Sequence, residues 1–144
     1  MEGLIFIAPL AGVISLVFAA FFAKSVLKED AGNKKMKEIQ GAIQEGSMAY
    51  LNRQYKTIAM VSIILSLLIL FLLDDGLKIA VGFLAGAISS AVAGYIGMSV
   101  SVRANVRTAN AASSGLEKAM SVAFRGGAVT GLAVVGLALL GTSG

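Results

Sequence analysis

The chain has 144 residues, of which 57% are hydrophobic and 14% are charged, and its mean hydropathy is +0.85. Because soluble domains carry about 25% charged residues, this composition is typical of an integral membrane protein. Cysteine, histidine and tryptophan are absent, which excludes disulfides, zinc sites built from Cys and His, and catalysis by a Cys nucleophile or a His base.

The first apolar stretch predicts a membrane-spanning helix over about residues 3–27. Its uncharged part, from Gly3 to Ala23, is long enough to cross about 30 Å of hydrocarbon at ~1.5 Å per residue. A cleaved secretory signal has a basic segment before its apolar core, whereas Glu2 precedes this one and Lys24 follows it. We therefore expect a retained span.

Residues 34–56 are predicted to form a helix outside the hydrocarbon, on the basic side of the membrane. The apolar residues Ile39, Ile43 and Tyr50 follow helical spacing. The polar residues between them are then able to face water: Lys37, Glu38, Gln44 and Glu45.

The second span is predicted at about residues 57–73, directly after this helical segment. We favour one continuous helix over about 34–73, although Gly41 and Gly46 weaken such a helix by roughly 1 kcal/mol each relative to Ala. The alternative is a separate amphipathic helix that lies on the membrane surface, with its lysines toward anionic lipid.

The third and fourth spans are predicted at about residues 77–105 and 116–141. The sequence Ser114-Gly115-Leu116-Glu117 fits a capping box, in which Ser caps the first amides and Glu reaches back to the capping residue. The capping box predicts a tight turn over residues 108–113, between the two spans.

The basic residues are distributed unevenly between the two sides of the membrane. All of them except Lys78 fall either between the first and second spans or around the junction of the third and fourth. The positive-inside rule places that side in the cytoplasm. The sequence therefore predicts an all-α integral membrane protein with four transmembrane helices, a single membrane domain over residues 1–144, and its N-terminus outside.

Small residues recur at every fourth position in three of the predicted spans, which lets helix backbones approach closely in a membrane. The first span has Ala11, Ser15, Ala19 and Ala23; the third has Gly82, Gly86, Ser90 and Gly94 beside Ser89, Ala93, Gly97 and Ser101; the fourth has Gly127 and Gly131. These rows predict a tightly packed bundle, made with these spans or with others.

The acidic residues do not predict a catalytic or metal site. No charged residue lies in the middle of a span, although ion pathways usually contain one, so the chain is interpreted as scaffold. Asp74 and Asp75 are predicted to form a solvated turn. The remaining acids are scattered among lysines: Glu29, Asp30, Glu38, Glu45 and Glu117. We predict no catalytic, cofactor-binding or metal-binding residue in this chain.

Three arginines lie near the ends of the third and fourth spans. Arg103 and Arg107 flank Asn105, and Arg125 precedes a Gly pair. We favour a structural role, in which these side chains reach outward to the lipid headgroups. A weaker alternative is a positive field for an anionic substrate. Nucleic acid is not expected as a partner, since the basic residues lack a stacking platform beyond Tyr50 and Tyr55.

Five segments, in order and at matching spacing, resemble the first four helices of the membrane-bound, ion-translocating pyrophosphatases of the prokaryotic type. These segments are residues 43–59, 86–90, 94–98, 104–109 and 123–129. The resemblance covers essentially the whole chain.

The resemblance implies a pump that couples diphosphate hydrolysis to export of Na⁺ or H⁺, with Mg²⁺ as cofactor and a possible requirement for K⁺ or Na⁺. It implies a homodimer of subunits with roughly sixteen helices each, in which the first four belong to an outer ring. The family's residues for Mg-diphosphate begin on the fifth helix, so none is carried over to this chain. A prokaryotic plasma membrane is the expected location.

On this interpretation the chain is an N-terminal fragment of the pump. It is expected to pack against the remaining helices of the same pump and the lipid bilayer, and to be inactive alone. The apolar part of the fourth span ends near Leu140, and about 22 Å from Gly126 is short of a 30 Å core, so truncation within this span is expected. The alternative is a free-standing four-helix membrane protein or an accessory subunit without catalytic activity. A small ion-coupled exporter is less favoured, because no carboxylate lies within a span.

Overall fold

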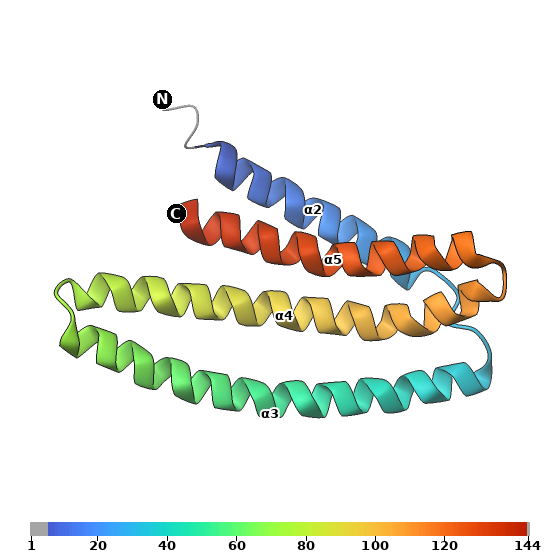
Figure 1. The fold of residues 1–144 in the computed structure, drawn as a ribbon, viewed down its shortest axis with the longest axis horizontal. Coiled ribbons are helices and arrows are strands. Elements are labelled where there is room, and N and C mark those ends of the chain that lie inside the picture. Colours follow the sequence, from blue (N-terminus) through green and yellow to red (C-terminus); the bar gives the residue numbers. More distant parts are fainter. Residues whose placement is uncertain (1–5, 144) are drawn as a thin grey trace.

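The computed structural model describes residues 6–143, and it contains four helices and no strand in that range. The helices are α2 (Ile7–Leu27), α3 (Lys34–Leu72), α4 (Gly76–Ala112) and α5 (Leu116–Ser143) (Figure 1). Each is long and apolar enough to cross a membrane, so the prediction of an all-helical membrane protein with four spanning segments is confirmed. Residues 3–5 of the first predicted span lie outside the described part of the chain.

Helix α3 is one continuous helix of 39 residues, as the favoured interpretation predicted. The side chain of Asn33 caps it by accepting a hydrogen bond of 3.0 Å from the amide of Met36. At ~1.5 Å per residue the helix is about 58 Å long, well beyond a 30 Å hydrocarbon core. One end of α3 therefore extends out of the membrane. In that part Ile39, Ile43 and Tyr50 are exposed, although their spacing suggested a packed face.

The predicted turn at residues 108–113 is wrong, because α4 continues to Ala112. This stretch is rich in Ala, the strongest helix former, and the hydroxyl of Ser113 donates to the carbonyl of Asn110 at 2.6 Å. The reversal occurs instead at Ser113–Gly115, where Gly115 has φ +124°. α5 begins directly afterwards at Leu116, and no side-chain hydrogen bond of a capping box at Ser114 is found among the described residues.

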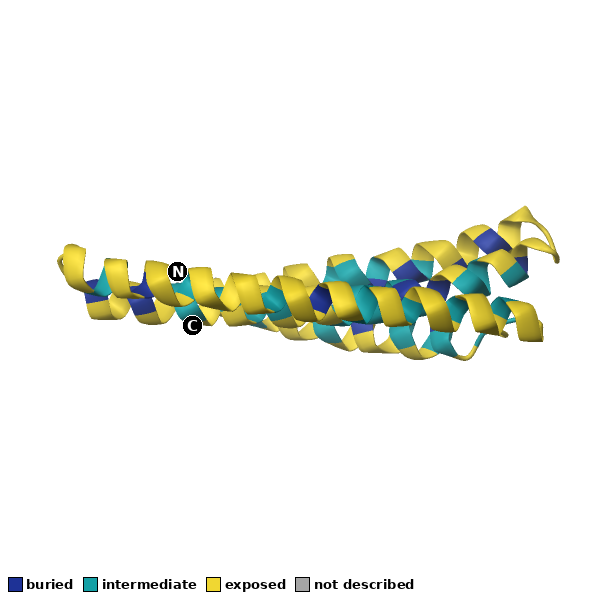
Figure 2. Ribbon diagram, turned by 90° about the horizontal axis from the view of Figure 1, so that it is seen from below, coloured by how far each residue is buried: buried dark blue, intermediate teal, exposed yellow. Residues whose placement is uncertain are grey.

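The four helices form an open layer in the order α3, α4, α5, α2 (Figure 1). α2 packs along α5 and touches α4 only marginally. Seen along the layer, most of the ribbon is exposed, and buried residues occur only in short, scattered stretches (Figure 2). The largest fully buried side chains are only valines: Val26, Val122 and Val129. Large apolar side chains such as Phe21 and Phe71 remain exposed, so the layer leaves apolar surface to be covered by lipid or by other helices.

Glycines allow α2 and α5 to approach closely. A Cβ built on Gly12 of α2 would lie 2.9 Å from the carbonyl oxygen of Gly136 on α5. A Cβ on Gly136 would lie 2.8 Å from Cγ of Leu16 and 2.9 Å from the carbonyl oxygen of Gly12. The backbones are therefore in direct contact here, as small-residue packing in membranes requires.

The predicted small-residue rows are only partly used within the described layer. On α4, Gly97 lies against Thr130 of α5, with 2.7 Å from its built Cβ to Cγ2, and Ala93 is buried. Gly82 and Gly86, in the neighbouring row of α4, have open space around them, as do Gly127 and Gly131 of α5. The packed face of α5 instead contains Val122, Gly126, Val129, Ala133 and Gly136. Gly127 and Gly131 therefore do not pack against the other described helices, and their packing against helices outside this chain stays a prediction.

Tyr55 joins α3 to α4, since its hydroxyl donates a 2.7 Å hydrogen bond to the carbonyl of Ala91. We expect Tyr55→Phe to lower the free energy of unfolding by about 0.5–1.5 kcal/mol, because one part-buried hydrogen bond is lost without a change in shape. SDS titration followed by circular dichroism measures this loss. Tyr50→Phe, at a position that is 58% exposed, is the matched control and is expected to be neutral.

Candidate functional site

Polar side chains gather where the end of α2 meets α4 and the start of α5. We call Ser25, Glu29, Arg107 and Arg125 the arginine cluster. Arg107 of α4 donates from Nε to the carbonyl of Glu29 at 3.0 Å and from Nη2 to the carbonyl of Leu27 at 3.3 Å. Its Nη1 donates to the carbonyl of Arg103 at 2.7 Å. Arg107 therefore satisfies carbonyls at the C-terminal end of α2, where the helix leaves them without partners and the dipole is negative.

Arg125 of α5 binds the same end of α2 through side chains. Its Nη2 lies 2.8 Å from Oε1 of Glu29 in an ion pair, and both side chains are about three-quarters buried. Its Nη1 donates to the hydroxyl of Ser25, and its Nε donates to the carbonyl of Ser121 at 3.2 Å. A small apolar core lies at the same end of the molecule: Val26, Ala104, Ala111, Ala119 and Val122.

The expectation that Arg107 and Arg125 reach outward to lipid headgroups is wrong in this structure, because both guanidinium groups bind to the end of α2. The unpaired carbonyls at the end of α2 offer these guanidinium groups direct partners in a part-buried site, where hydrogen bonds to a charged group are strong. Sequence reasoning missed this because Arg107 and Glu29 are 78 residues apart. The one available signal was the acid at position 29, beyond the end of an apolar span.

The loop between α2 and α3 is held in place by local hydrogen bonds. The carboxylate of Asp30 accepts from the amide of Gly32 at 3.0 Å, and Asn110 of α4 donates to the carbonyl of Asp30 at 3.2 Å. Gly32 has φ +81°, and a Cβ built on it would meet the side chains of Met36 and Asn110. A residue with a Cβ would be strained there. The arginine cluster and the hydrogen bonds of this loop together fix the path of the chain from the end of α2 to the start of α3.

The acidic residues do not form a metal centre within residues 6–143, where no group of three or more Asp, Glu, His or Cys side chains lies close enough to hold an ion. Asp75, at the α3–α4 turn, has φ 58°, and its carboxylate pairs with Lys78 at 3.1 Å in a site where both side chains are over 70% exposed. Such an exposed pair contributes little. These residues do not fit Mg²⁺, which needs carboxylates converging in a near-octahedral site.

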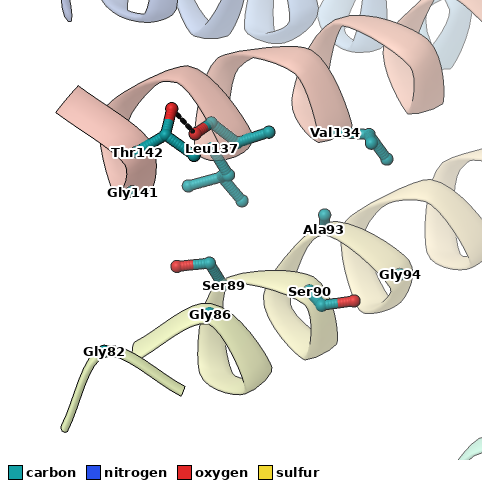
Figure 3. Close-up of a pocket in the computed structure, with 11 residues that line it drawn as sticks. Gly82, Gly86, Ser89, Ser90, Ala93, Gly94, Val134, Leu137, Gly141 and Thr142 are labelled. Atoms are coloured by element: carbon teal, nitrogen blue, oxygen red, sulfur yellow. Dashed lines mark hydrogen bonds between the residues drawn. The ribbon is translucent and has the colours of Figure 1, made fainter. Parts of the chain in front are cut away.

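A cavity with a volume of about 510 Å³ lies between α4 and α5. Gly82, Gly86 and Ser90 line one wall, and Val134 and Leu137 face them across the cavity (Figure 3). α5 lies farther from α4 toward its C-terminal end (Figure 1), which is why the glycines at this end of α4 have no neighbour. No charged residue lines the cavity, so it offers room for apolar groups and no group that performs chemistry.

The ion pair in the arginine cluster makes a measurable prediction. We expect a double-mutant cycle with Glu29→Gln and Arg125→Gln to give a coupling free energy of about 1 kcal/mol, because the pair is shielded but not fully buried. SDS titration of the four proteins measures it, and the coupling should fall in high salt. The same cycle on Asp75 and Lys78, a largely exposed pair, is the control and should give nearly zero. Equal coupling in the two cycles would contradict the structure at Glu29.

Comparisons with known proteins cover almost the whole chain. The family model described as inorganic H⁺ pyrophosphatase matches residues 13–144. The K⁺-insensitive pyrophosphate-energized proton pump of Methanosarcina mazei is 80% identical over 143 residues, which are 99% of this chain and 21% of that protein. The K⁺-insensitive pyrophosphate-energized proton pump 2 of Moorella thermoacetica is 53% identical over 137 residues, 95% of this chain and 20% of that protein.

A third relative pumps a different ion according to its name. It is a candidate K⁺-stimulated pyrophosphate-energized sodium pump of Clostridium tetani, 45% identical over 136 residues, which are 92% of this chain and 19% of that protein. The chain spans about a fifth of the length of these relatives. With the family model matched over residues 13–144 and four membrane-spanning helices in the structure, this chain belongs to the inorganic H⁺ pyrophosphatase family of membrane pumps.

Proposed function

We propose that this chain is the N-terminal, scaffold-forming part of a membrane pump that couples diphosphate hydrolysis to ion export. The observation that carries the proposal is the match of the chain, over nearly its full length, to proteins named as pyrophosphate-energized pumps. The structure suits a supporting role, because its charged groups hold helix ends together instead of converging on a cavity.

The partners proposed for the open layer are the remaining helices of the same pump and the lipid bilayer. Exposed apolar side chains occur on every helix, for instance Phe18 on α2, Ile63 on α3, Ile88 on α4 and Phe124 on α5. A single layer of helices cannot bury such side chains on both of its faces. Mg²⁺ and diphosphate would then bind to residues outside this chain, and the complete pump would be a homodimer, as the resemblance implies.

The proposed ion is H⁺, in a pump that does not require K⁺. The relatives that are 80% and 53% identical both carry names of K⁺-insensitive proton pumps, whereas the relative named as a sodium pump is 45% identical. The proposal predicts that diphosphate-driven acidification of inverted vesicles by the complete pump is unchanged when K⁺ is replaced by choline. Dependence of the activity on Na⁺ would contradict it.

The proposed orientation has the N-terminus outside and the arginine cluster at the cytoplasmic side of a prokaryotic plasma membrane. The chain has no cysteine, so single-cysteine variants can be labelled without background. Asp74→Cys, in the α3–α4 turn, should react with a membrane-impermeant maleimide on intact cells. Lys118→Cys, near the start of α5, should react only after the cells are opened. The reverse pattern would overturn the orientation and leave the family assignment intact.

The scaffold role is tested by the chain on its own. The purified chain should show no Mg²⁺-dependent release of phosphate from diphosphate, since its acids do not converge. Circular dichroism of the same sample must show the helical content of the structure. Hydrolysis by this folded chain would show that catalytic groups lie within it, and the scaffold proposal would be wrong.

A further inference from the structure

A polar pocket lies between α3 and α4, apart from the arginine cluster. Its volume is about 220 Å³, several times the ~30 Å³ that a water molecule occupies in the liquid, so it has room for a polyatomic group. Its walls combine polar side chains with two methionines and a valine: Gln44, Ser47, Met48, Tyr95, Met98, Ser99, Val102 and Arg103.

Arg103 supplies the only charge among the residues that line this pocket. Its side chain is half-buried. Among the described residues, no carboxylate lies within 4.0 Å of its guanidinium group, in contrast to that of Arg125. Its backbone carbonyl, not its side chain, is what Arg107 binds. Glu45 is exposed and does not line the pocket.

The remaining polar groups are neutral and able to donate hydrogen bonds. Gln44 has an amide, Ser47 and Ser99 have hydroxyls that rotate, and Tyr95 has a phenolic hydroxyl. One positive charge surrounded by neutral donors, with no acid in the wall, is a set of groups that favours an anion over a cation. The flat guanidinium fork matches two oxygens of a phosphate group.

The depth of the pocket in the membrane indicates whether a phosphate group bound there would belong to a lipid headgroup or to a soluble anion. About 20 residues of helix cross a 30 Å hydrocarbon core. Counted from Lys78, at the exposed α3–α4 turn, this length ends near Met98, and Arg103 lies roughly 7 Å beyond it. Counted back along α3 from its last residue, Leu72, the same length ends near residue 52, and residues 44–48 lie roughly 6–12 Å beyond the core. The headgroup layer is about 5–8 Å thick on each side, so both walls reach it.

We propose that this pocket binds the phosphate group of an anionic phospholipid in the leaflet on the basic side of the membrane. Arg103 forms a bidentate contact with the phosphate oxygens, and the hydroxyls of Ser47 and Ser99 donate to the same group. Met98, at the edge of the hydrocarbon core, faces the first carbons of the lipid chains. Bound in this way, the lipid fills the gap between α3 and α4 at headgroup level. Free phosphate or diphosphate has the same chemistry, and the test below distinguishes these sources.

The experiment measures lipid retention by the purified chain in nanodiscs made from phosphatidylglycerol and phosphatidylcholine. After transfer to mild detergent, the phosphatidylglycerol that remains bound is counted by native mass spectrometry. Arg103→Gln is compared with Arg53→Gln, because Arg53 is exposed on α3, lines none of the pockets described and carries the same charge. Arg103→Lys keeps the charge and loses the fork. Circular dichroism verifies that each variant is folded.

We expect Arg103→Gln to weaken phosphatidylglycerol binding at least about tenfold, as loss of a charge-assisted hydrogen bond implies. Arg53→Gln should bind like the unmodified chain, Arg103→Lys should be intermediate, and millimolar phosphate or diphosphate should not displace the lipid. Displacement by diphosphate that depends on Arg103 would support the phosphate site and assign it to a soluble anion, overturning the lipid as its source. Equal lipid retention in Arg103→Gln and Arg53→Gln, with no binding of phosphate to either, would overturn the proposal.

Discussion

Gly136→Val is expected to separate α2 from α5 and to lower the free energy of unfolding by about 3 kcal/mol, at the upper end for overpacking. A Cβ at this position would lie 2.9 Å from the backbone carbonyl of Gly12. Since that oxygen belongs to a helix backbone, only movement of α2 as a whole relieves the contact. Val adds two further methyl groups at the same place. SDS titration of the purified chain, followed by circular dichroism, measures the loss.

Gly131→Val is the matched control for this substitution. Gly131 lies on the same helix but is exposed, with nothing within 4 Å of a built Cβ. The exchange is the same, so its effect on helix propensity is the same, and we expect a change within about 0.5 kcal/mol. If Gly131→Val destabilised the chain as much as Gly136→Val, the close contact between α2 and α5 would be contradicted.

Arg107→Leu is expected to cost about 2–4 kcal/mol and to loosen the end of α2. The variant leaves the carbonyls of Leu27 and Glu29 without their donor, and a part-buried carbonyl without a partner costs about 1–3 kcal/mol. Hydrogen exchange should show faster exchange over residues 28–33, while the middle of α2 stays protected. SDS titration gives the loss in stability.

Arg107→Lys separates the charge of this residue from its geometry. Lysine keeps the positive charge near the C-terminal end of α2, which favours a cation, but one ammonium group does not span the carbonyls that the guanidinium fork reaches. We expect about half of the stability lost in Arg107→Leu to be recovered. Full recovery with Lys would mean that the charge alone matters, and the hydrogen bonds of Arg107 would then not explain the stability of this end.

The sequence was sufficient to predict the helices, because their signal is local. Apolar runs of spanning length and the absence of central charges defined all four, and the continuity of α3 through Gly41 and Gly46 followed from the unbroken pattern. The prediction failed where local signals competed. Thr108 to Ala112 looked like a turn beside a possible capping box, but the Ala-rich stretch remains helical and Gly115 makes the reversal.

The contacts between helices were less predictable, because they depend on which faces meet. The four-residue spacing on α5 favoured Gly127 and Gly131, and only the arrangement of α2, α4 and α5 decides that Gly126 is buried instead. Likewise, Arg107 was recognised as a residue near a helix end, but its partner Glu29 lies on another helix end far away in sequence. Such pairings are properties of the assembled layer.

The measurement that tests the central claim most directly is diphosphate-driven proton uptake by a chimera of the Methanosarcina mazei pump. In this chimera the segment that is 80% identical is replaced by the present chain. If this chain is the scaffold part of such a pump, inverted vesicles with the chimera should take up protons at close to the parental rate, and vesicles with the same pump lacking the segment should not. A folded, membrane-inserted chimera that hydrolyses no diphosphate and moves no protons would contradict the account.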